Sequence, residues 1–321
     1  MLVRDRFDSA ENCAEKLQAF IWFGERNLMA VRDLFLPLLN YPNPPLAASI
    51  EAVVDLAESL SQGPFNSGAH VQVQTRISAL ILQIEIGPGL YFEGAHIGEF
   101  LEAETKKSIR TAQALDLSFR EICMGRHVLP RCRIEKRNSY DGRQLFMEEA
   151  RLHHITVLPM RKGDVNHQDM AEGLIFESGR PVLVFPELPT QRLAKSFERI
   201  AVGWDGSRAA ARAIADAMPF LRRAAEVRIF SVSNEKTMPS VSRADEFVQQ
   251  LVSEGVESIY EQIPMAKGDN IGNFLTKYIA DHRSDLLVMG GYGHSRIREF
   301  ILGGATKSVL ANPPGWVLLS H

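Results

Sequence analysis

The sequence predicts an α/β protein of two tandem repeats, each an open five-stranded parallel sheet flanked by helices in a Rossmann-like arrangement. Short apolar runs alternate with segments whose apolar residues recur at helical spacing, and this order occurs twice in the 321 residues. Strands that alternate with helices form parallel sheets covered on both faces. A repeated order of elements indicates an internal duplication.

The C-terminal repeat, residues 197–321, shows the alternation most clearly. The run FERIAVGW predicts a buried strand, and DGS after it predicts a turn with Ser207 as the N-cap of a helix. Pro313 and Pro314 end the last predicted helix, because proline cannot continue one. Strands are expected at 197–204, 225–232, 257–265, 285–290 and 315–321, and helices at 208–224, 243–255, 269–284 and 303–312.

The N-terminal repeat, residues 29–190, follows the same order with weaker signals. Its closing segment, AEGLIFESGRPVLVFPE, has the layout of TKSVLANPPGWVLLSH at the end of the other repeat: a helix, a break and a strand. The segment LPTQRLAKS links the two repeats. Strands are expected at 32–41, 69–82, 130–138, 155–160 and 180–187, and helices at 47–60, 98–123, 145–154 and 168–179.

Residues 1–28 fit neither repeat. Met29 immediately precedes the first predicted strand, AVRDLFLPLL. We therefore expect residues 1–28 to be an extension, either appended to the two repeats or wrongly annotated and not native. Peptides from residues 8–25, found by mass spectrometry of the natively expressed protein, would contradict this expectation.

The composition is that of a globular soluble protein, with 45% hydrophobic residues, 23% charged residues and a net charge of -3. It shows no electrostatic preference for nucleic acid or membrane. Cys13, Cys123 and Cys132 are too few and too scattered for a disulfide framework, which favours a reducing cytoplasm. The apolar stretch at 19–41 is interrupted by charges, so it predicts no transmembrane helix, and no secretory signal precedes it.

Two glycine clusters flank a nine-residue spacer in the segment VMGGYGHSRIREFILGGATKSVL. Gly290 and Gly293 form the first cluster, and Gly303 opens the second. Together with AVGWDGS at the end of an earlier strand, this segment resembles the G-x2-G-x9-G-(S/T) nucleotide loop of the universal stress protein family. The resemblance covers residues 197–321, and the N-terminal repeat resembles a degenerate copy. Gly304 departs from the family's Ser/Thr and removes a hydroxyl that would bond phosphate.

The resemblance implies an adenine nucleotide alpha hydrolase-like fold that binds ATP, alone or with Mg2+. Glycines let backbone N–H groups approach a ligand, and the first N–H groups of a helix favour an anion. In the implied site Asp205 faces the ribose or base, Val232 and Met289 form apolar walls for the adenine, and the backbone N–H groups of Gly290, Gly293, Gly303, Gly304 and Ala305 face the phosphates.

Each of these residues also has a structural alternative. Glycines beside a strand-to-helix turn are common for packing alone, and Asp205 in WDGS equally suits a helix-initiating turn. Trp204 either stacks on the base or fills the crevice. Arg296 and Arg298 either reach phosphate or remain solvated or paired with acids. His153 has no third ligand at metal-binding spacing, so we expect it to be structural, and we expect no metal site formed by the protein alone.

The N-terminal repeat lacks the phosphate-binding segment. Pro159 stands where the first glycine should be, Asn40 stands near the expected aspartate, and the segment after the fourth strand is too short for the spacer. We expect this repeat to be a fixed partner. Its strand RPVLVF would pair with WVLLSH and so supply the contact that single-domain relatives find in a second chain. A homodimer of the whole chain remains open.

The leading expectation is a cytoplasmic stress-response protein whose C-terminal repeat binds ATP or a related adenine nucleotide as a regulatory ligand. The alternative is an interaction or dimerisation module of the same fold that binds no nucleotide. An adenylating enzyme would need an SGGxDS-type loop where this sequence has GWDGS. The sequence has neither a GxxxxGK[ST] loop nor a Ser-His-Asp order, so we expect no catalytic residues and at most slow ATP hydrolysis.

Overall fold

The computed structural model describes residues 31–40, 43–61, 74–85, 95–138, 142–188, 193–233, 244–265, 269–291 and 304–321. The chain divides into two units, Met1–Val31 and Arg32–His321, and both repeats belong to the second unit. The predicted extension at 1–28 lies outside the described residues. None of the helices that the structure describes combines the length and the apolarity needed to cross a bilayer.

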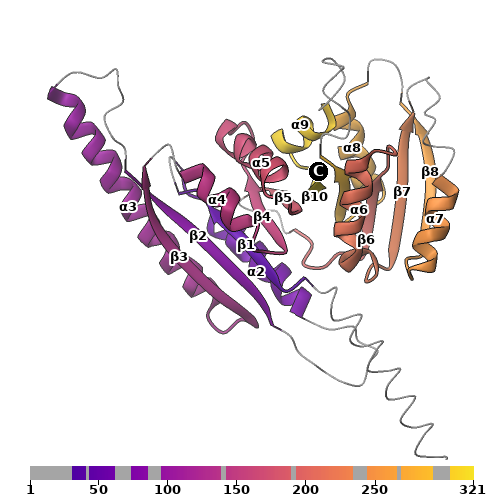
Figure 1. Cartoon of the computed structure of the whole chain (residues 1–321), viewed down its shortest axis with the longest axis horizontal. Helices are drawn as coiled ribbons and strands as arrows, with labels where there is room; N and C mark the ends of the chain where they lie inside the picture. The colour runs from indigo at the N-terminus through magenta and orange to yellow at the C-terminus, as the bar shows by residue number, and fades with distance from the viewer. Residues whose placement is uncertain are drawn as a thin grey trace, which may run out of the picture. The chain divides into compact units, whose positions relative to one another are not determined.

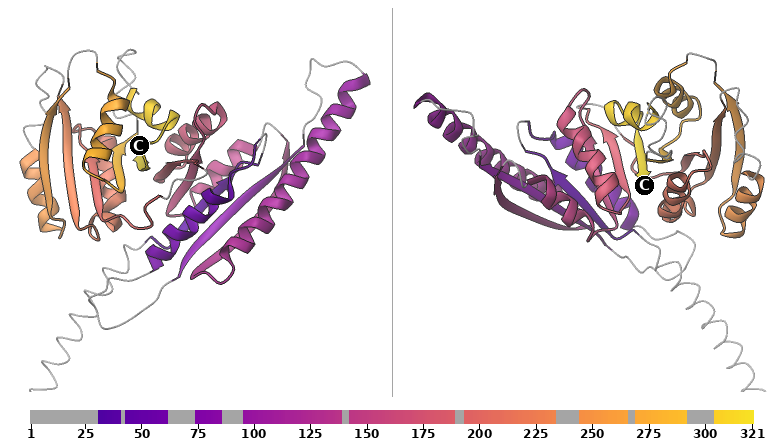
Figure 2. Two further views of the ribbon diagram at one scale, coloured as in Figure 1. Left: turned by 180° about the vertical axis from the view of Figure 1, so that it is seen from behind. Right: turned by 45° about the horizontal axis from the view of Figure 1, so that its top comes forward.

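The N-terminal repeat contains five strands and four helices in its described residues, in the predicted order (Figure 1). They are β1 (Asp33–Leu38), α2 (Ala47–Ser61), β2 (Thr75–Glu85), α3 (Ala95–Cys123), β3 (Val128–Asn138), α4 (Gly142–Ala150), β4 (Ile155–Met160), α5 (Val165–Glu177) and β5 (Val182–Pro186). The long helix α3 runs along β2 and β3 (Figure 2).

The described residues of the C-terminal repeat likewise form five strands and four helices. They are β6 (Arg199–Gly203), α6 (Arg208–Leu221), β7 (Glu226–Ser233), α7 (Ala244–Ser253), β8 (Ser258–Pro264), α8 (Ile271–Asp281), β9 (Leu286–Gly290), α9 (Gly304–Ala311) and β10 (Trp316–Ser320). Ser207 caps α6 as predicted, because its side chain accepts a hydrogen bond from the backbone N–H of Ala210.

The strands lie in the order β3-β2-β1-β4-β5-β10-β9-β6-β7-β8. Within each repeat all pairs are parallel, and each repeat places its first strand beside its fourth. The predicted parallel α/β architecture is therefore confirmed. Instead of two separate sheets, the described strands form one continuous sheet, because β5 and β10 pair antiparallel. Leu183 lies opposite Leu318, with Val182 opposite Leu319 on one side and Val184 opposite Val317 on the other.

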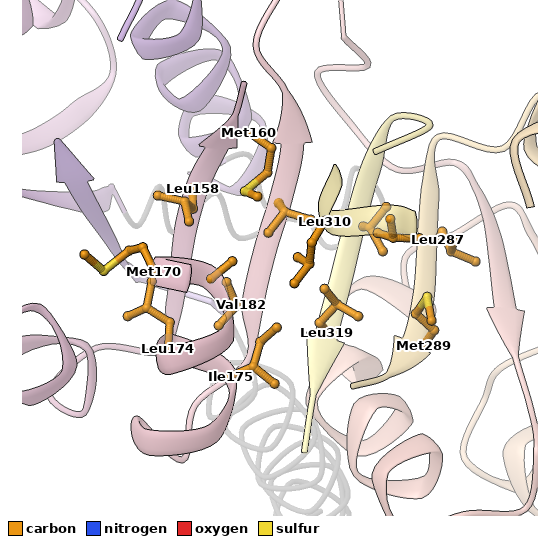
Figure 3. Close-up of a cluster of buried hydrophobic side chains, with 14 of the residues drawn as sticks. Leu158, Met160, Met170, Leu174, Ile175, Val182, Leu287, Met289, Leu310 and Leu319 are labelled. Carbon is orange, nitrogen blue, oxygen red and sulfur yellow. The ribbon is translucent and has the colours of Figure 1, made fainter. Parts of the chain in front are cut away.

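Helices cover both faces of the sheet. On one face, α4, α5, α8 and α9 contribute to a single cluster of buried apolar side chains that crosses the junction between β5 and β10. In this cluster Ile175 and Val182 of one repeat lie near Leu310 and Leu319 of the other (Figure 3). The helices α2, α3, α6 and α7 bury their apolar side chains elsewhere in the core.

Among the helices, the one expected at 145–154 departs most from its predicted ends. Residues 145–154 were expected to be helical, but α4 spans Gly142–Ala150 and the chain turns before His153. The imidazole of His153 is buried and stacks on the ring of Phe35, with ring centroids 5.3 Å apart. Its Nδ1 lies 3.0 Å from Oδ1 of Asp33. These contacts with β1 hold His153 outside the helix and give it a packing role.

Candidate functional site

The candidate site lies where the strand order of the C-terminal repeat reverses. The strands β6 and β9 are parallel neighbours, with Ile200 opposite Leu286, and the chain leaves them towards opposite ends of the sheet. In open α/β sheets, ligands bind in the crevice beyond the carboxyl ends of strands at such a point. Asp205 follows β6 and Gly290 ends β9, so the two segments lie at the same edge of neighbouring strands.

Asp205 organises the turn that begins α6. Its Oδ1 accepts a hydrogen bond from the backbone N–H of Ser207 at 2.9 Å. The Ser207 hydroxyl oxygen in turn accepts from the backbone N–H of Ala210 at 3.1 Å and so caps α6. Between them Gly206 takes a φ of +71°, which glycine adopts at little cost. Asp205 is half-buried. The helix-initiating role foreseen for it is therefore real, and it leaves the carboxylate at the carboxyl edge of the sheet.

Trp204 packs against the protein's own aromatic side chain. Its indole stacks on Phe247 of α7, with ring centroids 4.5 Å apart and planes 5° from parallel. Its backbone is held by β7, because its N–H donates to Phe230 O and its carbonyl accepts from the Ser231 hydroxyl. Its indole Nε1 is buried and has no hydrogen-bond partner among the described residues. These contacts favour the alternative in which Trp204 packs against the protein itself instead of stacking on a base.

Gly290 is required by close packing. A Cβ added there would lie 2.5 Å from the backbone nitrogen of Ala210 and 2.7 Å from the carbonyl carbon of Ala209. Real Cβ atoms essentially never come within 3.0 Å of another heavy atom. The glycine thus lets the start of α6 approach the end of β9. Close packing of α6 on β9 therefore accounts for a glycine at this position.

Gly291 is a second tightly placed glycine, which sequence reasoning missed. Its N–H donates to Ser320 O at 2.7 Å, and its carbonyl lies 2.9 Å from Nδ1 of His321. A Cβ there would lie 2.9 Å from Cγ2 of Ile175 in α5. The doubled glycine in VMGGYG was the available signal. Because the motif spacing counts only one of the pair, the second attracted no attention.

Val232 and Met289 belong to the apolar lining expected for the site. Met289 is buried in the central cluster, and Val232 is half-buried against the same cluster. Both lie at the carboxyl ends of their strands, β7 and β9, on either side of β6. The structure therefore brings them to the same end of the sheet as Asp205.

The second glycine cluster reaches the described residues at Gly304, the first residue of α9. A Cβ added at Gly304 would meet only Cγ2 of Ile271 at 3.7 Å, an ordinary contact. Ala305 follows, half-buried against the central cluster. The first N–H groups of a helix have no partner within it and favour an anion. Gly293, Gly303 and the spacer with His294, Arg296 and Arg298 lie outside the described residues.

A further glycine, Gly272, lets the start of α8 approach the middle of α9. A Cβ at Gly272 would lie 2.6 Å from Cβ of Ser308, so only glycine allows this approach. Among the residues that the structure describes, no group of three or more His, Cys, Asp or Glu side chains could hold a metal ion.

The corresponding edge of the N-terminal repeat is built differently. Leu34, the second residue of β1, pairs with Ile155 in β4. Ile200, the second residue of β6, pairs with Leu286 in β9 in the same way. Four residues further on are Pro159 and Gly290, so Pro159 occupies the place of the first glycine, as predicted. Asn40 is buried, and its Nδ2 donates to the Ser108 carbonyl of α3 at 3.1 Å. It ties a helix to the sheet instead of facing a crevice.

Comparison with solved structures supports the fold. A universal stress protein from Archaeoglobus fulgidus DSM 4304 matches 91% of this chain and 97% of its own, at 14% identity and a TM-score of 0.61. A putative universal stress protein from Pseudomonas aeruginosa UCBPP-PA14 matches 92% and 94%, at 12% identity and a TM-score of 0.50. At these identities the likeness shows the fold, and it extends over both repeats.

A universal stress protein solved in complex with cAMP covers 39% of this chain and 98% of its own, at 19% identity, with a TM-score of 0.32 that is too low to bear on this chain. A search of curated protein sequences finds no significant match. The model of the universal stress protein family matches residues 196–321, the whole of the repeat that carries the crevice and both glycine clusters. The C-terminal part of this chain, residues 196–321, belongs to the universal stress protein family.

Proposed function

We propose that this protein is a tandem universal stress protein whose C-terminal repeat binds ATP, or a related adenine nucleotide, as a regulatory ligand. The observation that carries the proposal is the adjacency of β6 and β9 at the point where the strand order reverses. It brings Asp205, Val232 and Met289 to the edge from which the glycine segment leads into α9 at Gly304. The backbone N–H groups of Gly290, Gly293, Gly303, Gly304 and Ala305 face the phosphates in this proposal.

The N-terminal repeat, residues 29–190, acts in this proposal as the fixed partner of the repeat at 197–321. Its support is the antiparallel pairing of β5 with β10 and the buried cluster that crosses their junction. The nucleotide is a regulatory ligand and not a substrate to be turned over, and the cytoplasm is the compartment that supplies it. Single-domain relatives would meet a second chain at the same strand.

The first experiment asks whether the purified protein carries a nucleotide. Heat-released material is separated by chromatography and read by absorbance at the adenine band, and the emptied protein is then titrated with ATP by calorimetry, with and without Mg2+. The proposal predicts a saturable heat of binding at one site per chain. Neither released nucleotide nor binding at millimolar ATP would reject it.

A second experiment restores the hydroxyl that Gly304 lacks. A side chain fits there, because the nearest atom to an added Cβ is 3.7 Å away. A hydrogen bond to a charged group contributes about 1.5–3 kcal/mol, so Gly304→Ser should tighten ATP binding by roughly tenfold to a hundredfold. Gly304→Ala is the matched control, because it changes the backbone equally without adding a hydroxyl. Equal dissociation constants for the two variants would place the phosphates elsewhere.

The second candidate function is an interaction module of the same fold that binds no nucleotide. Two observations favour it: Trp204 is already stacked on Phe247, and Gly290 is explained by the packing of α6. Under this alternative the glycines serve the close approach of helices and strands. The absence of ATP binding in both the unchanged protein and Gly304→Ser, with the fold intact, is the outcome that would favour it.

A further inference from the structure

At the carboxyl edge of the N-terminal repeat, a carboxylate of the protein itself is buried beside the start of a helix. Glu187 directly follows β5, and its backbone N–H donates to Met160 O at the end of β4. Its side chain is only 1% exposed. An ionised side chain is costly to bury unless charges and hydrogen bonds compensate it. The contacts of this carboxylate therefore identify what stabilises it.

The Glu187 carboxylate is surrounded by hydrogen-bond donors. Its Oε1 accepts from the backbone N–H of Leu46 at 2.8 Å and from the Ser49 hydroxyl at 3.3 Å. Its Oε2 lies 2.7 Å from Nε and 2.6 Å from Nη2 of Arg161. The same Nη2 donates to Pro44 O at 2.9 Å, which holds the guanidinium in place. The carboxylate is thus bound from two sides, by the start of α2 and by Arg161.

This donor set is the one that proteins use to bind carboxylates and phosphates. It combines the N-terminal end of α2, a hydroxyl in the first turn of that helix, and an arginine whose planar group offers two N–H donors. Its place in the fold is also that of a ligand site. The helix α2 follows β1 as α6 follows β6, and Arg161 follows β4, the strand beside β1.

We propose that the N-terminal repeat contains an anion-binding site and that the carboxylate of Glu187 is its internal occupant. A free oxyanion finds the donors of Leu46, Ser49 and Arg161 already matched, so this repeat takes no external anion. In the C-terminal repeat, the residue that follows the last strand is His321, whose Nδ1 lies near Gly291 O. At this position the N-terminal repeat has an acidic side chain, and the C-terminal repeat has an imidazole. The proposal does not depend on nucleotide binding by the other repeat.

The proposal predicts that a small carboxylate can replace the side chain. Glu187→Ala removes the carboxylate and leaves the three donors around a space of about its size. Sodium formate is the probe, because its anion has the shape and charge of the deleted group. The readout is the midpoint temperature of thermal unfolding, Tm, of the full chain at pH 7, measured against equal concentrations of sodium chloride. A ligand that binds the folded state raises Tm in a saturable way.

We expect Glu187→Ala to lower Tm and formate to raise it again in this variant, beyond the effect of chloride. Neither the unchanged protein nor the double variant with Arg161→Ala should respond to formate in this way. The matched control is Glu254→Ala, because Glu254 also pairs with an arginine, Arg222, at 3.2 Å but is exposed. No formate-specific gain in Glu187→Ala, or an equal gain in the unchanged protein, would overturn the proposal.

A second variant covers the case in which Glu187→Ala does not fold. Glu187→Gln keeps the shape of the side chain but leaves Arg161 beside a neutral amide. We expect it to lower Tm, and we expect Arg161→Met added to it to recover part of the loss by removing the uncompensated cation. A Tm for Glu187→Gln equal to that of the unchanged protein would show that the anionic character of this site is immaterial.

Discussion

Replacing Gly290 with alanine should destabilise the fold, whatever the site binds. The added Cβ would lie 2.5 Å from Ala210 N, 2.7 Å from the Ala209 carbonyl carbon and 3.0 Å from the Ala209 Cβ. The two closest are backbone atoms at the start of α6, which cannot rotate away as a flexible side chain can. Overpacking of this kind costs about 1–3 kcal/mol. Since the conflict is with backbone, we expect a loss near the upper end, about 2–3 kcal/mol.

The assay is equilibrium unfolding in urea, followed by circular dichroism. The expected result is a lower midpoint with an unchanged slope, because the area exposed on unfolding is the same. Gly304→Ala is the matched control: the nearest atom to its Cβ is 3.7 Å away, and alanine in a helix is more favourable than glycine by up to about 1 kcal/mol. If Gly290→Ala unfolds at the same urea concentration as the unchanged protein, the reasoning that α6 approaches β9 too closely for a side chain at position 290 is refuted.

Two further predictions concern titratable groups. The hydrogen bond from Arg126 lowers the pKa of Glu58 from its ordinary 4.5, against the effect of burial, so this pair stabilises the fold above about pH 4.5 and the contribution is lost as pH falls through the lowered pKa. Arg126→Gln should therefore lower Tm at pH 6 and differ less from the unchanged protein at pH 3; an undiminished difference at pH 3 would contradict this. Burial raises the pKa of Cys123 to about 11 and that of Cys132 to about 12. Since the thiolate is the reactive form, iodoacetamide at pH 7.5 should label neither residue in the native protein and both after unfolding, as peptide mass spectrometry would show, and native labelling of either would refute the stated burial.

Most elements could be predicted because their signals are local. The segment ITVLPM was expected as a strand and is β4 with the same ends, and Ser207 was expected as an N-cap and is one. The helix expected at 145–154 departs most from its prediction, because it ends at Ala150. The contacts that hold His153 outside α4 come from Phe35 and Asp33, more than a hundred residues earlier in the chain. No pattern within the helix itself could indicate them.

The candidate site was predictable only in part. Motif spacing identified Gly290, and the structure adds that Ala209 and Ala210 demand a glycine there. This demand depends on the pairing of β6 with β9, strands about ninety residues apart in sequence. The sequence did not indicate a packing role for Gly291 for the same reason, because the residues that enclose it, Ile175 and Ser320, belong to other elements.

The sequence by itself determined the alternation of strands and helices, the duplication and the loss of the glycine segment from the N-terminal repeat. These are properties of hydrophobic period, caps and spacing, which act over a few residues. The tertiary structure decided the antiparallel register in which β5 and β10 pair, and it placed Glu187 at the start of α2, 141 residues from Leu46. Such contacts depend on which faces the folded chain brings together, and a buried carboxylate and an exposed one look the same in a sequence.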